Sequence, residues 1–158
     1  MFSRNPTARL LFMPTAKKVF DEAAQKRLAE AVKEAELHTS GEIRLVVEDN
    51  CPTDDAYDRA LELFGEMNMH ETAEENGVLI YLALRSHKFS ILGDKGIHEK
   101  LPEGFWGEIR DNMRAAFRQG HYVEGLETAI VASGKALGDY FPRQDDDQNE
   151  LPDDVVIR

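Results

Sequence analysis

Apolar residues recur along the chain with two periods, one typical of helices and the other of strands. Spacings of three and four residues predict helices over residues 21–38, about 53–67, about 97–100, from about 103, and 122–140. Alternating or continuous apolar runs predict strands over residues 42–48, 78–84 and 87–92. The second of these strands is apolar on both faces, which is typical of a central strand covered by helices on both sides.

The order of these elements predicts the topology of the sheet. The strands at 42–48 and 78–84 flank a helix, so they are expected to be parallel, with a right-handed crossover. The strand at 87–92 follows a short turn and is expected to form an antiparallel hairpin with its predecessor. We therefore predict an α/β fold, a three-layer α/β/α sandwich around a small mixed sheet of three to four strands. The crossover helix is expected to bury Tyr57, Ala60, Leu61 and Phe64, with Met67 as a further candidate.

The length of 158 residues is that of one domain of ordinary size. We place this domain at residues 20–142, after an N-terminal extension at 1–19. Residues 143–158 contain six acidic residues and two arginines, a net charge of −4. Such an acidic, aperiodic segment predicts a disordered tail, which either keeps the protein in solution or binds a partner through Val155–Ile157.

The formal net charge of the chain is −11, which argues against nucleic acid as a partner because phosphate contacts need clustered cations. It also disfavours anionic lipid and leaves cations or basic proteins as partners. No apolar run is long enough to span a membrane or to form the core of a signal peptide, so we expect no membrane insertion and a cytoplasmic location. The single cysteine, Cys51, excludes an internal disulfide and a cysteine-rich zinc site.

The predicted topology gathers polar residues at the two ends of the sheet. The third strand runs opposite to the first two, so it ends where they begin. That end collects Ser40, Glu42, Glu74, Glu75, Asn76, Asp94 and His98. Carboxylate and amide oxygens are the ligands that calcium and magnesium prefer, although acidic residues at loop ends are also commonly solvated or cap helices. The opposite end, where ligands usually bind in open α/β sheets, collects Glu48, Asp49, Arg85 and His87.

Established catalytic motifs are missing from the sequence. There is no glycine-rich loop followed by Lys-Ser/Thr and no Gly-x-Ser-x-Gly motif. The segment His70–Glu74 resembles the start of a zinc-protease helix, but Glu74 stands where the second histidine would be needed. We therefore assign no catalytic residue from motifs.

Several segments, taken in order, resemble the TPM domain family of thylakoid-lumen phosphatase-like and photosystem-repair-like proteins, and most closely its short soluble bacterial members. The resemblance covers roughly residues 20–142. It is carried by Ser40–Arg44, Asn76–Ala83, Ile91–His98, Phe105–Trp106 and the spaced glycine and aromatic residues of 120–142.

The resemblance implies an α/β/α sandwich, in agreement with the hydrophobic pattern. It also implies a divalent-cation site at an acidic end of the sheet, because several members are thought to bind calcium there. That site would correspond here to Asn76 and Asp94, with Glu42 as a neighbour. Thylakoid members have been described as acid phosphatases, which implies phosphate chemistry as a second possibility.

Two functions follow. The first is a divalent-cation-binding or protein-interaction module without catalysis, binding Ca²⁺ or Mg²⁺ through Glu42, Glu74, Asn76 and Asp94, with no organic cofactor and with an unidentified protein as partner. The alternative is a metal-assisted phosphatase acting on phosphomonoesters. In that alternative Asp94 ligates the metal or attacks phosphorus, Lys95 holds the phosphate and His98 supplies acid catalysis.

Overall fold

A four-stranded mixed sheet forms the middle layer of the protein, in a computed structural model that describes residues 13–144 and 155–158. The strand order is β3-β2-β1-β4, with β1 parallel to both β2 and β4, and β3 antiparallel to β2. The strands are β1 (Glu42–Glu48), β2 (Gly77–Ala83), β3 (Lys88–Gly93) and β4 (Val155–Ile157). The predicted parallel pair and the predicted hairpin are both confirmed.

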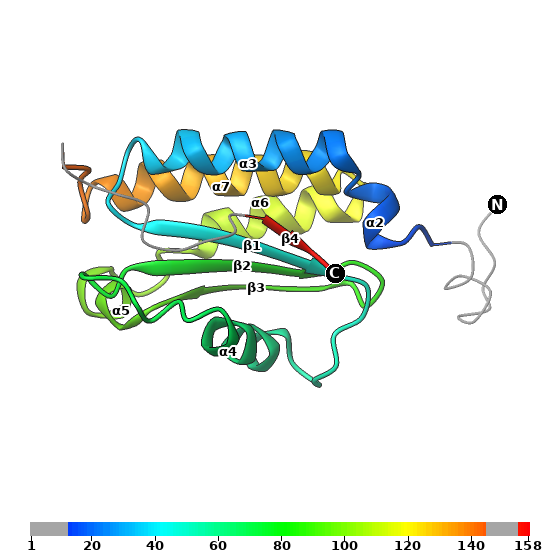
Figure 1. Ribbon diagram of the computed structural model, residues 1–158, viewed down its shortest axis with the longest axis horizontal. Coiled ribbons are helices and arrows are strands. Elements are labelled where there is room, and N and C mark those ends of the chain that lie inside the picture. The colour runs from blue at the N-terminus through cyan, green and yellow to red at the C-terminus, as the bar shows by residue number, and fades with distance from the viewer. Residues whose placement is uncertain (1–12, 145–154) are drawn as a thin grey trace.

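Helices cover both faces of the sheet, which confirms the α/β/α sandwich. On one face lie α3 (Glu22–Glu36), α6 (Gly107–Arg118) and α7 (Tyr122–Gly138), and on the other lies α4 (Ala56–Glu66) (Figure 1). Two short helices, α2 (Ala16–Val19) and α5 (Lys95–Lys100), lie near opposite ends of the strands (Figure 1). Among residues 13–144 and 155–158, none of the helices combines the length and the apolarity that crossing a bilayer requires.

The core has two parts because every residue of β1 and β2 is buried. Ile43 and Ile80 belong to the part under α3, α6 and α7, whereas Tyr81 and Phe64 belong to the part under α4. Helices α3 and α7 pack closely, since a Cβ added at Gly134 would lie 2.6 Å from the backbone of α3. Burial on both faces explains the continuously apolar sequence of β2, whereas β1 also buries the charged side chains of Glu42, Arg44 and Glu48.

The predicted tail at residues 143–158 is wrong for its last residues. Val155–Ile157 form β4 and pair with Leu45–Val47 of β1, so the sheet includes residues beyond 142. Backbone pairing and contact with the core order these residues despite the acidic segment before them. The remainder of the predicted tail, residues 145–154, lies outside the described residues.

Part of the predicted N-terminal extension also belongs to the folded domain. Ala16 of α2 is fully buried, and its backbone N–H donates to Asp49 Oδ1 at 2.6 Å. Residues 1–12 of that extension lie outside the described part of the chain.

The predicted inner face of α4 is wrong at two positions. Tyr57 and Leu61 are 44% and 47% exposed, and Ala56 and Leu63 are buried with the predicted Ala60 and Phe64.

Candidate functional site

The amino ends of β1 and β2 meet the end of β3, as the predicted topology requires. Glu42 pairs with Gly77 in the parallel register, and the Asp94 N–H donates to the Gly77 carbonyl at 2.9 Å. Gly77 of β2 therefore lies between Glu42 of β1 and Asp94, which follows β3, so the ends of three strands meet in one region. We call this region, formed by Ser40, Glu42, Glu74, Asn76 and Asp94, the amino-end rim.

Three of the rim residues share a hydrogen-bond network. The Ser40 hydroxyl donates to Glu74 Oε2 at 2.6 Å, and Asn76 Nδ2 donates to Ser40 Oγ and to Glu74 Oε2 at 3.2 and 3.3 Å. Asn76 is buried, whereas Glu74 is exposed. The Asn76 amide is thus held by its nitrogen, and its oxygen is not part of this network.

Asp94 is the most unusual of the rim residues. Its Oδ1 accepts from the Lys95 N–H at 2.7 Å, which caps α5, and lies 3.2 Å from His70 Nδ1. The residue is 7% exposed, and its Oδ2 is buried with no hydrogen-bond partner in the described part of the protein. A buried carboxylate oxygen without a donor is unfavourable, so this atom is available to a ligand that brings positive charge.

His70 is a rim neighbour that the sequence did not place here. It follows α4 in an irregular connection, its side chain is 67% exposed, and its ring packs edge-on against Phe64 at 4.6 Å. Neither hydrophobic period nor turn chemistry specifies where such a residue lies. We find no signal in the sequence that would have placed it beside Asp94.

Glu42 lies at the rim, but its carboxylate is close to the guanidinium of Arg44. Its Oε2 is 3.9 Å from Arg44 Nη2, and the fully buried Arg44 also contacts Glu36 Oε2 at 3.1 Å. The charge of Glu42 is therefore partly balanced within the fold.

The two predicted phosphate-binding residues lie on α5 beyond Asp94. Lys95 Nζ is 3.9 Å from Glu99, and both side chains are mostly exposed. His98 is exposed as well. Their role in holding phosphate stays a prediction.

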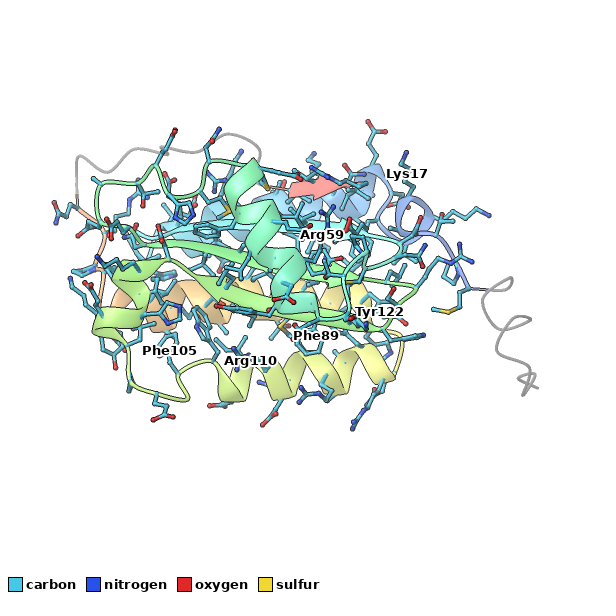
Figure 2. All side chains as sticks on the ribbon, turned by 90° about the horizontal axis from the view of Figure 1, so that it is seen from below. Lys17, Arg59, Phe89, Phe105, Arg110 and Tyr122 are labelled. Carbon is cyan, nitrogen blue, oxygen red and sulfur yellow. The ribbon has the colours of Figure 1, made fainter. Side chains whose placement is uncertain are left out.

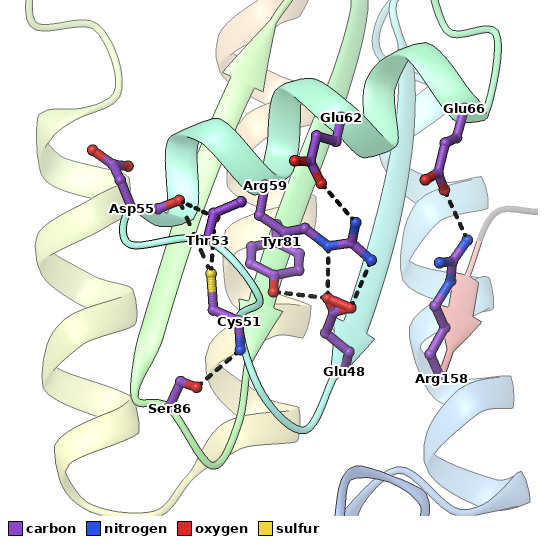
Figure 3. A network of polar contacts seen from close by, with 10 residues as sticks. All are labelled: Glu48, Cys51, Thr53, Asp55, Arg59, Glu62, Glu66, Tyr81, Ser86 and Arg158. Carbon is purple, nitrogen blue, oxygen red and sulfur yellow. Dashed lines mark hydrogen bonds and ion pairs between the residues drawn. The ribbon is translucent and has the colours of Figure 1, made fainter.

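The opposite end of the sheet also buries a carboxylate, but there it is fully engaged. Arg59 of α4 donates from Nε and Nη2 to the two oxygens of Glu48, at 2.9 and 3.0 Å (Figure 3). The Tyr81 hydroxyl donates to Glu48 Oε2 at 3.0 Å. We call Glu48, Arg59 and Tyr81 the carboxyl-end cluster.

The carboxyl-end cluster changes the acidity of two of its members. Hydrogen bonding to Glu48 is the main cause that raises the pKa of Arg59 above its ordinary value. Burial, followed by the hydrogen bond to Glu48, raises the pKa of the Tyr81 phenol well above its usual range. Both groups therefore stay protonated under ordinary conditions, and the cluster is a stable ion pair with a neutral donor.

The loop after β1 is held by hydrogen bonds at the same end. Asp49 accepts from α2 as described above, and the Cys51 N–H donates to Ser86 Oγ at 2.9 Å. The Cys51 thiol lies 3.4 Å from Thr53 Oγ1 (Figure 3). These contacts fix the loop and present no nucleophile paired with a base.

A ready-made metal centre is missing from the part of the chain that the structure describes. Within residues 13–144 and 155–158, no three His, Cys, Asp or Glu side chains gather as metal ligands. A cation at the amino-end rim would thus need amide or backbone oxygens and water to complete its coordination.

Solved structures with similar folds come from several bacteria. The BA42 protein of the psychrophile Bizionia argentinensis is 38% identical, with a TM-score of 0.81, over 87% of this chain and 94% of that chain. An N-terminal domain from P. gingivalis is 20% identical, with a TM-score of 0.63, over 89% and 96% of the two chains. The N-terminal domain of cg2496 from Corynebacterium glutamicum is 11% identical, with a TM-score of 0.58, over 82% and 80%. The last two likenesses show the fold alone.

The family comparison identifies the domain itself. None of the curated proteins compared with this chain matches it. The model of the TPM domain matches residues 15–136, from α2 to near the end of α7. This match covers most of the chain and agrees with the resemblance seen in the sequence. The chain therefore belongs to the TPM domain family.

Proposed function

We propose that this protein is a binding module that takes up a divalent cation, Ca²⁺ or Mg²⁺, at the amino-end rim. The observation that carries the proposal is the buried Oδ2 of Asp94, which no donor within the described structure satisfies. A cation beside this oxygen would replace the water that the carboxylate lost on folding. Asn76 and Glu74 are the rim residues best suited to supply further oxygens.

The charges around Asp94 favour a cation over an anion. The rim holds three carboxylates, and its nearest basic partner, His70, is largely solvated. Glu42 adds negative potential even though Arg44 partly balances it. Because few protein oxygens converge and water must supply the rest, we expect weak binding, with a dissociation constant of roughly 0.1–1 mM.

Calcium titration of the ¹⁵N-labelled protein tests the proposal by NMR. We expect saturable shifts at Asn76, Asp94 and the first turn of α5. Asp94→Asn keeps an oxygen that caps α5 and removes the charge, so we expect binding at least about tenfold weaker. Asp111→Asn, which removes an exposed carboxylate on α6, is the matched control and should bind as the unmodified protein does. An absence of saturable shifts at millimolar calcium, or equal binding by both variants, contradicts the proposal.

Phosphatase activity stays the alternative, and the structure adds a detail to it. The histidine whose side chain contacts the Asp94 carboxylate is His70, at 3.2 Å, so an acid catalyst at this rim would be His70 before His98. Turnover of a generic phosphomonoester that requires Mg²⁺ and is lost in both Asp94→Asn and His70→Gln would favour this alternative over a purely binding role.

A further inference from the structure

A second concave site lies on the opposite side of the sheet from α4, toward the end of the β2–β3 hairpin. It is a cavity of about 280 Å³ bounded by β2, β3 and the junction of α6 with α7. Leu82 lies at its base, and Phe89, Phe117 and Tyr122 form its aromatic walls. We call it the aromatic pocket. Phe89 and Tyr122 lie close together beside α6 in Figure 2.

The walls of the aromatic pocket are held in place by packing. Phe117 meets Phe89 edge-on, with ring centroids 5.3 Å apart, and its centroid is 5.8 Å from that of Tyr122. A Cβ added at Gly125 would lie 3.1 Å from the Phe117 ring, so α7 approaches α6 closely here. All three aromatic side chains are only half-buried. The pocket is thus built by the fold and open to solvent, which favours binding without reorganisation.

The two charged side chains that line the aromatic pocket are both basic, although the protein is strongly acidic. They are Arg114 and Arg118, and His87 also lines the pocket. Arg114 lies over the Phe89 ring at 5.6 Å and pairs with the exposed Asp111 at 3.3 Å. Arg118 makes no side-chain hydrogen bond or ion pair with any residue that the structure describes. The guanidinium of Arg114 is therefore held against Phe89, whereas that of Arg118 has no side-chain partner within the described structure.

His87 lies in the turn that follows β2. Its φ is +53°, in the left-handed region that few residues other than glycine adopt, although histidine is among those found there more often. The turn follows β2, so the pocket lies at the carboxyl end of a parallel strand, where ligands bind in open α/β sheets.

A larger cavity, between α3 and α7, lacks this charge pattern. It measures about 600 Å³ and is lined by cations and carboxylates together, including the ion pair of Arg27 with Glu127. Its lining holds two cations and three carboxylates, so charges of both signs face this cavity. The aromatic pocket is smaller, and its lining combines apolar and aromatic side chains with basic ones.

We propose that the aromatic pocket binds a small organic anion, a carboxylate carried on a flat apolar body. The apolar body would stack between Phe89 and Tyr122 over Leu82. The carboxylate would pair with the guanidinium of Arg118, assisted by Arg114, because a planar guanidinium matches a carboxylate in two parallel hydrogen bonds. The volume suits a single ring with a short acid chain, and ligands this small bind in the millimolar range.

Titration of the full ¹⁵N-labelled chain with 3-phenylpropionate tests this proposal. We expect saturable amide shifts around Phe89, Phe117 and Tyr122. The matched alcohol 3-phenylpropan-1-ol keeps the ring and loses the charge, so we expect it to bind roughly three- to tenfold more weakly. Arg118→Gln should weaken 3-phenylpropionate by a similar factor and leave the affinity for the alcohol unchanged.

Arg110→Gln is the matched control, because Arg110 is exposed on the same helix and does not line the pocket (Figure 2). We expect it to bind 3-phenylpropionate as the unmodified protein does. Equal affinity for the acid and the alcohol overturns the proposal, as does equal weakening by Arg118→Gln and Arg110→Gln. An absence of saturable shifts at millimolar acid overturns it as well.

Discussion

The two ends of the sheet each bury a carboxylate and place it in different surroundings. At the carboxyl end, both oxygens of Glu48 accept from Arg59, and one also accepts from Tyr81. At the amino end, Asp94 uses one oxygen to cap α5 and leaves the other buried without a donor among the described residues. Glu48 is therefore committed to the fold, whereas Asp94 keeps capacity for an external cation. Whether protein donors already satisfy its oxygens therefore separates a structural carboxylate from a candidate ligand.

The largest effect should come from removing the engaged carboxylate. Glu48→Ala leaves Arg59, whose side chain is only 12% exposed, without its main partner. We expect the free energy of unfolding to fall by about 3 kcal/mol, measured by urea denaturation. Glu62 also pairs with Arg59 but is half exposed, so Glu62→Ala should cost about 0.5 kcal/mol or less. Equal losses in the two variants would mean that Glu48 is no more structural than a surface residue.

A packing change at the amino end should come next in size. Gly96 of α5 lies against the loop before β2, and a Cβ there would meet the Glu74 carbonyl oxygen at 2.3 Å. We expect Gly96→Ala to lower the free energy of unfolding by about 2 kcal/mol and to weaken calcium binding, because it moves α5 and the Asp94 cap.

Gly65→Ala provides the control for that substitution. Gly65 lies inside α4, and nothing lies within 4 Å of an added Cβ. The same change of residue should there raise the free energy of unfolding by about 0.5–1 kcal/mol. If both variants were stabilised, α5 would not be held tightly against the rim.

If calcium binds at Oδ2 of Asp94, it should raise the free energy of unfolding of the protein. In calcium-free buffer, we expect Asp94→Asn to lie within about 0.5 kcal/mol of the unmodified protein, because asparagine also caps helices. At calcium tenfold above its dissociation constant, the unmodified protein should gain about 1.4 kcal/mol, and the variant, which binds at least about tenfold more weakly, should gain about 0.4 kcal/mol or less. Denaturation at constant ionic strength measures both. Equal gains in the two proteins would assign the effect to salt and not to the rim.

Local patterns predicted most of the fold. The strand at 42–48 was correct to the residue because its apolar run lies between a glycine turn and a polar loop. The face of α4 was only partly predicted: Ala60 and Phe64 were assigned correctly, but the apolar Tyr57 and Leu61 were taken for the buried positions that Ala56 and Leu63 occupy. Only contact with the sheet decides which apolar positions of such a helix are buried.

Non-local pairing limited the other predictions. Val155–Ile157 is a three-residue apolar run after an acidic segment, and its pairing with β1 joins residues more than a hundred positions apart. The topology of the sheet correctly brought Asn76 and Asp94 to one end. It did not predict the contact of His70 with Asp94 or the pairing of Glu42 with Arg44. Strand order thus predicts which residues gather at one end of the sheet, whereas the charge balance of that candidate site depends on side chains from distant segments.

The smallest expected effect comes from removing the Tyr81 hydroxyl, the neutral donor of the carboxyl-end cluster. Tyr81→Phe keeps the buried ring and removes the hydrogen bond to Glu48, so we expect a loss of about 1 kcal/mol at neutral pH. Because the folded-state pKa of Tyr81 is raised, the stabilisation by its hydroxyl is present below the ordinary tyrosine pKa of about 10 and declines above it. The stability difference between the two proteins should therefore shrink as pH rises beyond that value. Ultraviolet titration supplies the readout: the native proteins should show equal tyrosinate absorbance and differ by one tyrosine only after alkaline unfolding. A difference before unfolding would mean that Tyr81 ionises in place, and that the carboxyl end is less tightly closed than the amino end.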